Sequence, residues 1–266
     1  ATPTKGMPTL KILYFDCSRG ASGDMILGAL LDSGAIELKK LKAELRKLRL
    51  KNFSISASKC RKNSISATKF KVHYNKNRHS GRLLKDVLAL IERSKLSPSV
   101  KENAKKIFIN LAIAESKVHG IKAQKVHFHE VCDIDSIVDI VAVSIAIELI
   151  GADKFYTSNL TVGNGLIKTE HGVLPSPGPA TLELLKGRKL KFSDIDHELL
   201  TPTAAAVFKV FTREAEPRSA FKIERMGYGA GEKDFDGISN VLRIIIGEIE
   251  SRSVLDFVGA PRLPDG

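Results

Sequence analysis

The sequence predicts an α/β protein: one compact domain built on a mixed sheet with flanking helices. An apolar run near the start, Leu10–Cys17, is short enough for a buried strand, and two strand-like runs at 221–231 and 240–250 close the chain. Between them lie several longer segments whose apolar residues recur at helical spacing. The 266 residues, 43% of them hydrophobic and 27% charged, suit a globular domain with its own core.

Local patterns predict four helices and a hairpin in the first half of the chain. A turn of small residues, SRGASGD, separates the first strand from a helix that ends at Gly34. Leucines three and four apart predict an amphipathic second helix, and Pro98 and Gly120 are typical of a helix start and a helix end. Two alternating runs joined by RKN predict the hairpin. The expected bounds are 25–34, 38–48, 83–93 and 98–119 for the helices and 53–74 for the hairpin.

The second half is more punctuated. Residues 162–181 include four glycines and three prolines, too many for regular structure, so we expect an irregular segment there. Pro202 directly after Thr201 predicts the capped start of a further helix. Residues 251–266 are expected to form an irregular tail.

Positive charge is concentrated in one region. Between Lys39 and Arg82 there are fifteen Lys and Arg against a single acid, Glu44, so this region carries +14 and the rest of the chain −2, within a total of +12. Such a region attracts a polyanion (nucleic acid, a nucleotide or an acidic protein) or is a solvated surface. Nucleic acid is disfavoured because no aromatic residues are interleaved to stack on bases. A small basic α+β lobe over 37–82 stays open.

The sequence offers no candidate for a membrane span or a secretion signal. The first apolar run is short and contains a lysine, and the longest one, Ile137–Ile150, is interrupted by Asp139, Ser144 and Glu148. Three cysteines cannot all pair, and their spacing matches no zinc motif. We therefore expect a protein of the reducing cytoplasm that does not contact a membrane.

The stretch VHFHEVCDIDSIVDIVAV, residues 126–143, concentrates metal-binding side chains before an apolar segment. A strand here puts His127 and His129 on one face and Glu130 on the other. A helix beginning near Asp135 stacks Asp135 and Asp139 one turn apart, where the two charges repel unless a cation binds between them. We predict that all five side chains converge on one pocket. The alternative is that Asp135 caps the helix, Asp139 bonds to nearby backbone and the histidines are core residues.

The turn SRGASGD joins a strand end at Asp16 to a helix start, a place where phosphates bind in many α/β proteins. It lacks the ending of a Walker loop, and the chain has no nucleophile elbow. Either it is a phosphate-binding turn with Ser22, Gly23 and Asp24 at the helix N-terminus, or it is an ordinary tight turn. His171 lies among glycine and prolines, where a histidine is often only a surface residue.

Five stretches together resemble the LarC-type nickel-insertion proteins and occur in the same order. They are LYFDCSRGASGDMILGALLDSG, VHFHEVCDIDSIVDIVAV, HGVLPSPGPATLELLKG, ELLTPTAAA and GYGAGEKDFDGISNVLR. The resemblance runs from about Leu10 to Glu248 and implies a family domain over 8–250. The sequence departs from the family pattern at Arg19, Cys132, Asp133, Leu200, Ala204 and Ser239. The family's C-terminal domain has no counterpart here, so we expect the N-terminal portion of such a protein.

The resemblance implies a nickel chelatase of the lyase class. Such proteins insert nickel into pyridinium-3,5-bisthiocarboxylic acid mononucleotide and cleave CTP with a divalent metal, manganese or magnesium. The product is the nickel-pincer nucleotide cofactor of lactate racemase. The expected partners are therefore this mononucleotide, a C-terminal LarC-type domain that binds CTP, and the lactate racemase apoenzyme. The alternative is a non-catalytic metal- or nucleotide-binding module that delivers cargo to a partner domain.

The residues and the resemblance together give a candidate site. The catalytic candidates are Asp16, Asp24 and Glu130. The cofactor-binding candidates are Ser18, Gly20, Ser22, Gly23, Thr201 and Thr203. The metal-binding candidates are His127, His129, Glu130, Asp135, Asp139 and His171.

Overall fold

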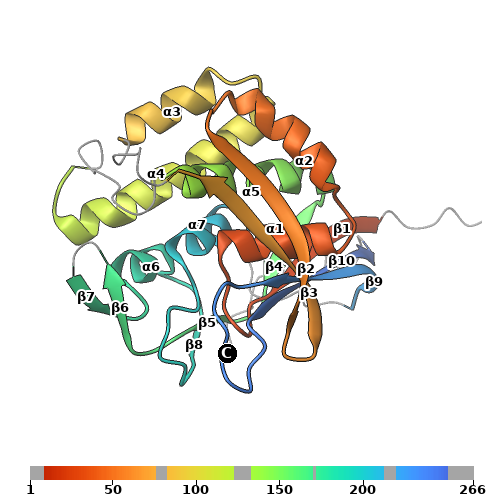
Figure 1. Cartoon of the computed structure of the whole chain (residues 1–266), viewed down its shortest axis with the longest axis vertical. Coiled ribbons are helices and arrows are strands. Elements are labelled where there is room, and N and C mark those ends of the chain that lie inside the picture. The colour runs from red at the N-terminus through yellow and green to blue at the C-terminus, as the bar shows by residue number, and fades with distance from the viewer. Residues whose placement is uncertain (1–8, 76–82, 123–132, 170–171, 213–219, 251–266) are drawn as a thin grey trace, which may run out of the picture.

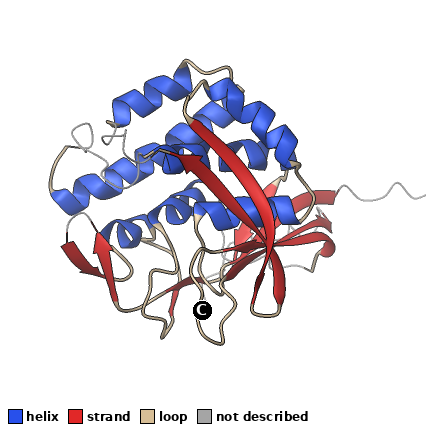
Figure 2. Ribbon diagram, in the orientation of Figure 1, coloured by secondary structure: helices blue, strands red, loops and turns tan. Residues whose placement is uncertain are grey.

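The structure, a computed structural model, describes residues 9–75, 83–122, 133–169, 172–212 and 220–250. These residues form a mixed α/β fold in which helices pack on one face of a six-stranded sheet (Figures 1 and 2). The predicted fold class is confirmed.

The central sheet combines parallel and antiparallel pairs in the order β2-β3-β9-β10-β1-β4. Strand β1 lies antiparallel to β10 and parallel to β4, and β9 lies antiparallel to β10. The hairpin β2–β3 joins the sheet through one parallel pair, Thr68 with Gly229 of β9. The strand bounds are Thr9–Asp16 (β1), Phe53–Lys62 (β2), Ile65–Tyr74 (β3), Lys154–Thr157 (β4), Lys222–Ala230 (β9) and Val241–Glu250 (β10).

Helices fill the other layer, and those expected from the sequence are confirmed. Ser97 accepts a hydrogen bond from the backbone N–H of Val100 at 3.2 Å, and Gly120 adopts a left-handed φ of 62°, so both predicted ends of the longest helix hold. The bounds are Gly23–Asp32 (α1), Leu38–Leu45 (α2), Arg46–Leu48 (the 3-10 helix η1), Leu84–Glu92 (α3), Pro98–His119 (α4), Ile134–Ile150 (α5), Pro179–Leu184 (α6) and Pro202–Phe211 (α7).

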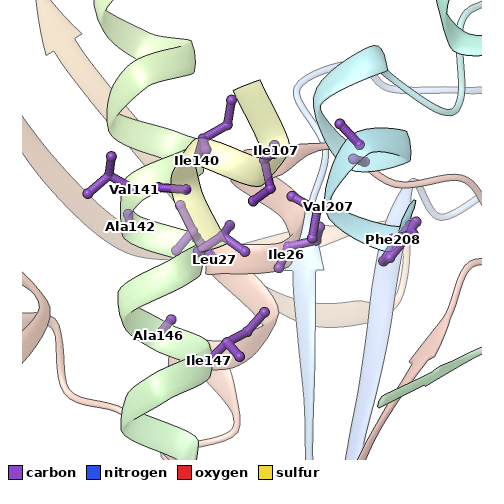
Figure 3. Packing of buried hydrophobic residues seen from close by; sticks show 14 of the residues in the cluster. Ile26, Leu27, Ile107, Ile140, Val141, Ala142, Ala146, Ile147, Val207 and Phe208 are labelled. Carbon is purple, nitrogen blue, oxygen red and sulfur yellow. The ribbon is translucent and has the colours of Figure 1, made fainter. Parts of the chain in front are cut away.

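Helix α5 is the centre of the core. It packs against α1, α2, α4 and α7. Figure 3 shows Ile140 and Val141 of α5 beside Leu27 of α1, with Ile107 of α4 and Val207 of α7 close by. Because α5 is buried on nearly every side, a carboxylate on it is costly unless it faces a polar space. Asp139 is that carboxylate.

Helix α1 lies unusually close to the sheet because glycines face it. A Cβ atom on Gly229 would lie 1.8 Å from the carbonyl oxygen of Met25, and one on Gly227 would lie 2.2 Å from that of Ala29. On the helix itself, a Cβ on Gly28 would lie 2.4 Å from the carbonyl oxygen of Thr68. This contact holds the start of α1 against β3 and β9 and fixes one wall of the site.

The expectation of an irregular segment at 162–181 is wrong. Two short two-stranded sheets and a helix occupy much of it, because the glycines and prolines lie mainly at the ends of the elements. Gly165 takes a left-handed φ of 83° before β6, and Pro179 is the first residue of α6. The strands are Leu160–Val162 (β5), Leu166–Thr169 (β6), Gly172–Pro175 (β7) and Leu190–Phe192 (β8).

The basic region is continuous with the rest of the fold in the residues described. Its helix α2 packs on α5, and the hairpin strand β3 packs against α1 and α5 and pairs with β9 at Thr68 (Figure 1). None of the helices in the described ranges is long and apolar enough to cross a membrane.

Candidate functional site

A cavity of about 580 Å³ opens where the N-termini of α1, α5 and α7 converge. The hairpin strand β3 and the loop between β9 and β10 complete its walls. Three segments that are far apart in the chain therefore place their helix starts around one space. The lining residues are Ser22, Asp24, Met25, Lys69, Phe70, Lys71, Val72, His73, Tyr74, Asp135, Asp139, Glu198, Leu199, Thr201, Gly231, Glu232, Lys233, Phe235 and Asn240.

One wall of the cavity is acidic. Asp24 comes from the first turn of α1, and Asp135 and Asp139 come from the first two turns of α5. Asp139 reaches the start of α1 because residue 23 has no side chain: a Cβ on Gly23 would lie 2.8 Å from Asp139 Oδ2. The buried Oδ1 atom of Asp139 has no hydrogen-bond partner among the described residues. A buried carboxylate oxygen without a hydrogen-bond partner is costly, which makes this atom a candidate for contact with a ligand.

Each converging helix start already carries a side-chain oxygen. Hydrogen bonds from the backbone N–H groups of Met25 and of Asp24 itself reach the Asp24 carboxylate. Asp135 Oδ1 accepts from the N–H of Ser136 at 2.8 Å, and Thr201 Oγ1 accepts from that of Ala204 at 3.3 Å. The helix termini thus present oxygens, two of them carboxylates, to the cavity, rather than only bare N–H donors.

Burial shifts the acidic groups strongly. The pKa of Asp139 is raised well above its ordinary value, first by burial and then by repulsion from Asp24 and Asp135. Burial also raises the pKa of Asp24, although hydrogen bonds from Ser22 and from backbone N–H groups oppose that change. The pKa of Tyr74 is raised by burial and by the nearby Asp135 and Asp133. The raised pKa values mean that Asp24 and Asp139 lose their protons at higher pH than an exposed aspartate does.

Strand β3 forms a second wall, which carries positive charge. Lys69, Lys71 and His73 line the cavity along this strand, and Tyr74 at its end donates a hydrogen bond to Asp133 Oδ2 at 2.9 Å. Asp133 is the residue just before α5. The tyrosine thus joins the basic strand to the start of the helix that carries Asp135 and Asp139.

The loop between β9 and β10 forms the third wall. Asn240 Nδ2 donates to the carbonyl oxygen of Lys233 at 2.9 Å, and Gly231 N–H donates to that of Asn240 at 3.0 Å, so the loop closes on itself. Phe235 stacks near His197, with ring centroids 5.3 Å apart. This loop therefore adds a lysine, an acid and an aromatic ring to the cavity surface.

The structure brings together several candidates named from the sequence. Asp135 and Asp139 share the cavity with Ser22, Asp24 and Thr201. Ser22 is the N-cap residue of α1, so the predicted position of SRGASGD at a helix N-terminus is confirmed, and its hydroxyl donates to Asp24. The predicted convergence therefore holds for the two aspartates. His127, His129, Glu130 and His171 lie outside the described residues.

Other candidates lie beside the cavity rather than in its lining. Asp16 pairs with Arg243, whose Nε donates to it at 3.0 Å, and accepts from Ser18. Gly20 takes a left-handed φ of 87° where its Cα approaches the backbone of Leu199, which suits glycine alone. Thr203 is in the first turn of α7 and is not among the lining residues. Asp16 and Gly20 therefore have packing roles, at the end of β1 and in the turn that follows it.

The sequence reading missed most of the basic and loop residues of the site. Lys69 and Lys71 lie two residues apart on a strand of the basic region. Their place in that region was the only indication in the sequence that they could bind an anion. Lys233 and Phe235 had no signal beyond their place in GYGAGEKDFDGISNVLR, one of the stretches that carry the family resemblance. Among the described residues no three His, Cys, Asp or Glu side chains are placed so that they could hold a metal ion by themselves. The acidic wall is therefore at most part of a ligand set.

Comparisons with known proteins agree with one another. A family model described as nickel insertion protein matches residues 13–258. The chain is 43% identical over 248 residues to a pyridinium-3,5-bisthiocarboxylic acid mononucleotide nickel insertion protein of Geobacillus kaustophilus, covering 90% of this chain and 60% of that protein. It is also 43% identical over 257 residues to the protein of the same name from Acetivibrio thermocellus, covering 93% and 63%. The chain thus spans about three fifths of these relatives' length. No solved structure matches it significantly.

Proposed function

Since this chain belongs to the nickel insertion protein family, we propose that it takes part in inserting nickel into pyridinium-3,5-bisthiocarboxylic acid mononucleotide. The observation that carries the proposal is the cavity itself, which has on one wall a buried carboxylate oxygen without a partner among the described residues, and lysines on another. The reaction needs both a cation and an anionic nucleotide in one place. A cavity with walls of opposite charge suits that requirement.

We assign nickel to the acidic wall. Asp139 has an oxygen without a partner among the described residues, and Asp24 and Asp135 lie on the same wall. We propose that His127, His129 and Glu130 complete the ligand set, because they directly precede α5 in the chain and histidine with carboxylate suits a first-row metal. His171 is a further candidate. Mixed ligands of this kind also suit an ion that has to be released.

The anionic groups of the mononucleotide are assigned to the basic walls. The start of α1 is already served by the Asp24 carboxylate, whereas Lys69, Lys71 and Lys233 form no ion pair in the part of the chain that the structure describes. Phosphate and thiocarboxylate would therefore lie nearer the lysines than the turn SRGASGD. Added salt should weaken precursor binding above about 0.15 M, where the Debye length is about 8 Å, and leave nickel binding nearly unchanged.

We further propose that turnover needs CTP with manganese or magnesium and the part of the relatives that this chain does not span. The support is the length comparison, since the chain covers 60% of the Geobacillus protein. As an enzyme the assembly would be a lyase-class chelatase of the cytoplasm, and the lactate racemase apoenzyme would receive its product. Asp16 and Glu130 stay catalytic candidates, and Thr201 at the cavity is a candidate for contact with the mononucleotide.

The test mixes the purified chain with nickel and the mononucleotide, with and without CTP and the remaining part of a relative, and follows the absorbance of the nickel product. We expect binding of both substrates by the chain alone, and product only when the remaining part is added. Binding without product under every condition would favour the delivery module. A chain that binds neither nickel nor the mononucleotide would contradict the proposal.

A further inference from the structure

Lys62 is a buried lysine outside the cavity whose contacts all converge on one cavity wall. It is the last residue of β2, at the tip of the hairpin, and is only 6% exposed. Its Nζ donates to Asp234 Oδ1 at 2.5 Å, to the carbonyl oxygen of Lys233 at 3.1 Å and to that of Glu232 at 3.4 Å. All three acceptors belong to the loop between β9 and β10.

The loop also donates a hydrogen bond back to the tip of the hairpin. Ser239 Oγ donates to the carbonyl oxygen of Lys62 at 3.1 Å. Both ends of the loop are thereby fastened to the same residue, which lies about 170 positions earlier in the chain. Strand β3 pairs with β9 only at Thr68 and Gly229, before the loop begins. Lys62 therefore holds the loop to the hairpin beyond the end of that pairing.

A buried lysine ammonium that donates hydrogen bonds to backbone carbonyl oxygens restricts the position of that backbone, here the loop between β9 and β10. The carboxylate of Asp234 is 85% exposed on its side chain, so water screens that ion pair and the two carbonyl contacts carry much of the positional constraint. The residues it holds include Glu232 and Lys233, and both line the cavity. Since Lys233 forms no ion pair among the described residues, its charge is available to a bound anion.

We propose that Lys62 is a positioning residue for the precursor: it holds the β9–β10 loop so that Lys233 meets the anionic groups of the mononucleotide. This inference rests on the proposed function for the identity of the anion. It predicts a residue that is outside the cavity lining and makes no contact with substrate, yet controls substrate affinity through one loop.

Four variants test the proposal: Lys62→Met, Lys62→Arg, Lys233→Gln and the control Lys59→Met. Lys59 lies in the same hairpin and also pairs with an aspartate, at 2.5 Å, but it contacts Asp32 rather than the loop. The control therefore removes the same charge without releasing the loop. Hydrogen exchange of residues 231–240 is measured without ligand, and affinities for nickel and for the mononucleotide are measured by calorimetry.

We expect Lys62→Met to accelerate exchange in the loop roughly tenfold or more and to weaken mononucleotide binding roughly five- to tenfold, with nickel affinity unchanged. Lys62→Arg should restore much of the affinity, and Lys59→Met should change neither quantity beyond about twofold. In the Lys233→Gln background, Lys62→Met should cost little further affinity, because the two residues act through one contact.

Unchanged hydrogen exchange of the loop in Lys62→Met would overturn the proposal that Lys62 holds the loop, whether or not the mononucleotide binds. Full additivity of Lys62→Met with Lys233→Gln would overturn the route through Lys233. A native chain that fails to bind the mononucleotide, with exchange still accelerated in Lys62→Met, would contradict the proposed function and the precursor role while leaving the loop clamp in place.

Discussion

The two ends of helix α1 carry aspartates in opposite situations. Asp32, at the C-terminal end, bonds to Lys59 at 2.5 Å, to the hydroxyl of Thr68 at 2.6 Å and to the N–H of Tyr228 at 3.0 Å. Although burial raises its pKa, these partners together lower it. Asp24, at the N-terminal end, has its pKa raised by burial. Its neighbour on the same cavity wall is another carboxylate, Asp139.

The helix dipole alone predicts the reverse, because it favours negative charge at the N-terminus and disfavours it at the C-terminus. Local partners decide instead. Asp32 is satisfied by the protein and ties α1 to β3 and β9, so its role is structural. Asp24 and Asp139 are held close together with no basic side chain bonded to them in the described residues. Carboxylates kept in that state support the proposal that this wall binds a cation.

The largest loss of stability should come from removing Asp32, the aspartate at the C-terminal end of α1 whose partners are all within the protein. Asp32→Ala leaves the N–H of Tyr228 and the hydroxyl of Thr68 without their acceptor and removes the partner of Lys59. We expect the free energy of unfolding to fall by about 3 kcal/mol. Urea denaturation measures it, with Lys59→Met as the control that should cost less than about 1 kcal/mol. Equal losses in the two variants would show that Asp32 matters only through its ion pair.

The pH dependence of stability should separate the two ends. The folded-state pKa of Asp139 lies above its ordinary value of 3.8. Between these two values, the Asp139 carboxyl is therefore protonated more often in the folded protein than in the unfolded chain. Its stabilising contribution is therefore present at low pH and lost as pH rises through the raised pKa. Asp32 has a lowered pKa and contributes stability that is lost as pH falls instead.

Asp139→Asn isolates the first effect, since Asp32 is present in both proteins. Within the window from about pH 4 up to the raised pKa, metal-free native protein should lose stability relative to this variant, at most at about 1.4 kcal/mol per pH unit. Denaturation curves at several pH values with a chelator present measure the difference. A difference that stays constant with pH would mean that Asp139 is already paired in the native protein.

Gly23→Ala should disturb the N-terminal end of α1 by steric contact with Asp139. The new Cβ would lie 2.8 Å from Asp139 Oδ2 and 3.2 Å from its Cβ, so the aspartate or the helix has to move. We expect a loss of about 1.5 kcal/mol in stability together with weaker nickel binding. In an Asp139→Ala background the same substitution should cost much less. A cost that is unchanged in that background would place the clash elsewhere.

The smallest effect concerns the link between the basic strand and α5. Tyr74→Phe removes the hydroxyl that donates a hydrogen bond to Asp133 and lies near Asp135, and should cost about 0.5–1 kcal/mol of stability. A double-mutant cycle with Asp133→Asn should give a coupling energy of similar size. Strict additivity of the two substitutions would show that the bond contributes nothing to stability.

Much of the fold could be predicted because its signals are local. Pro98 and Gly120 mark the ends of α4, and alternation marks the hairpin, with no reference to the rest of the chain. The short strands β4 and β8 were missed because three or four residues carry too little pattern. Each forms only by pairing with a strand elsewhere in the chain, β1 in one case and β5 in the other.

The site could be predicted only in part for the same reason. Asp135 and Asp139 stand out locally, since they are two acids one turn apart near the start of an apolar helix. Nothing local shows that Asp24 will lie near Asp139, which depends on α1 packing against α5 through Gly23. The lysines of β3 join the site because β3 packs against α1 and α5 and because Thr68 pairs with Gly229, 161 positions later in the chain. Contacts of that span follow from packing and not from a motif.

Nickel affinity tests most directly the proposal that the acidic wall binds a cation through Asp139, whose Oδ1 atom has no hydrogen-bond partner among the described residues. Calorimetric titration of nickel would compare the native chain with Asp139→Asn and with Asp16→Asn, which removes an equal charge from a carboxylate that Arg243 already satisfies. We expect at least a roughly tenfold loss of nickel affinity for Asp139→Asn, equivalent to about 1.4 kcal/mol, and a change within about twofold for Asp16→Asn. Equal nickel affinity in the native chain and Asp139→Asn would contradict it.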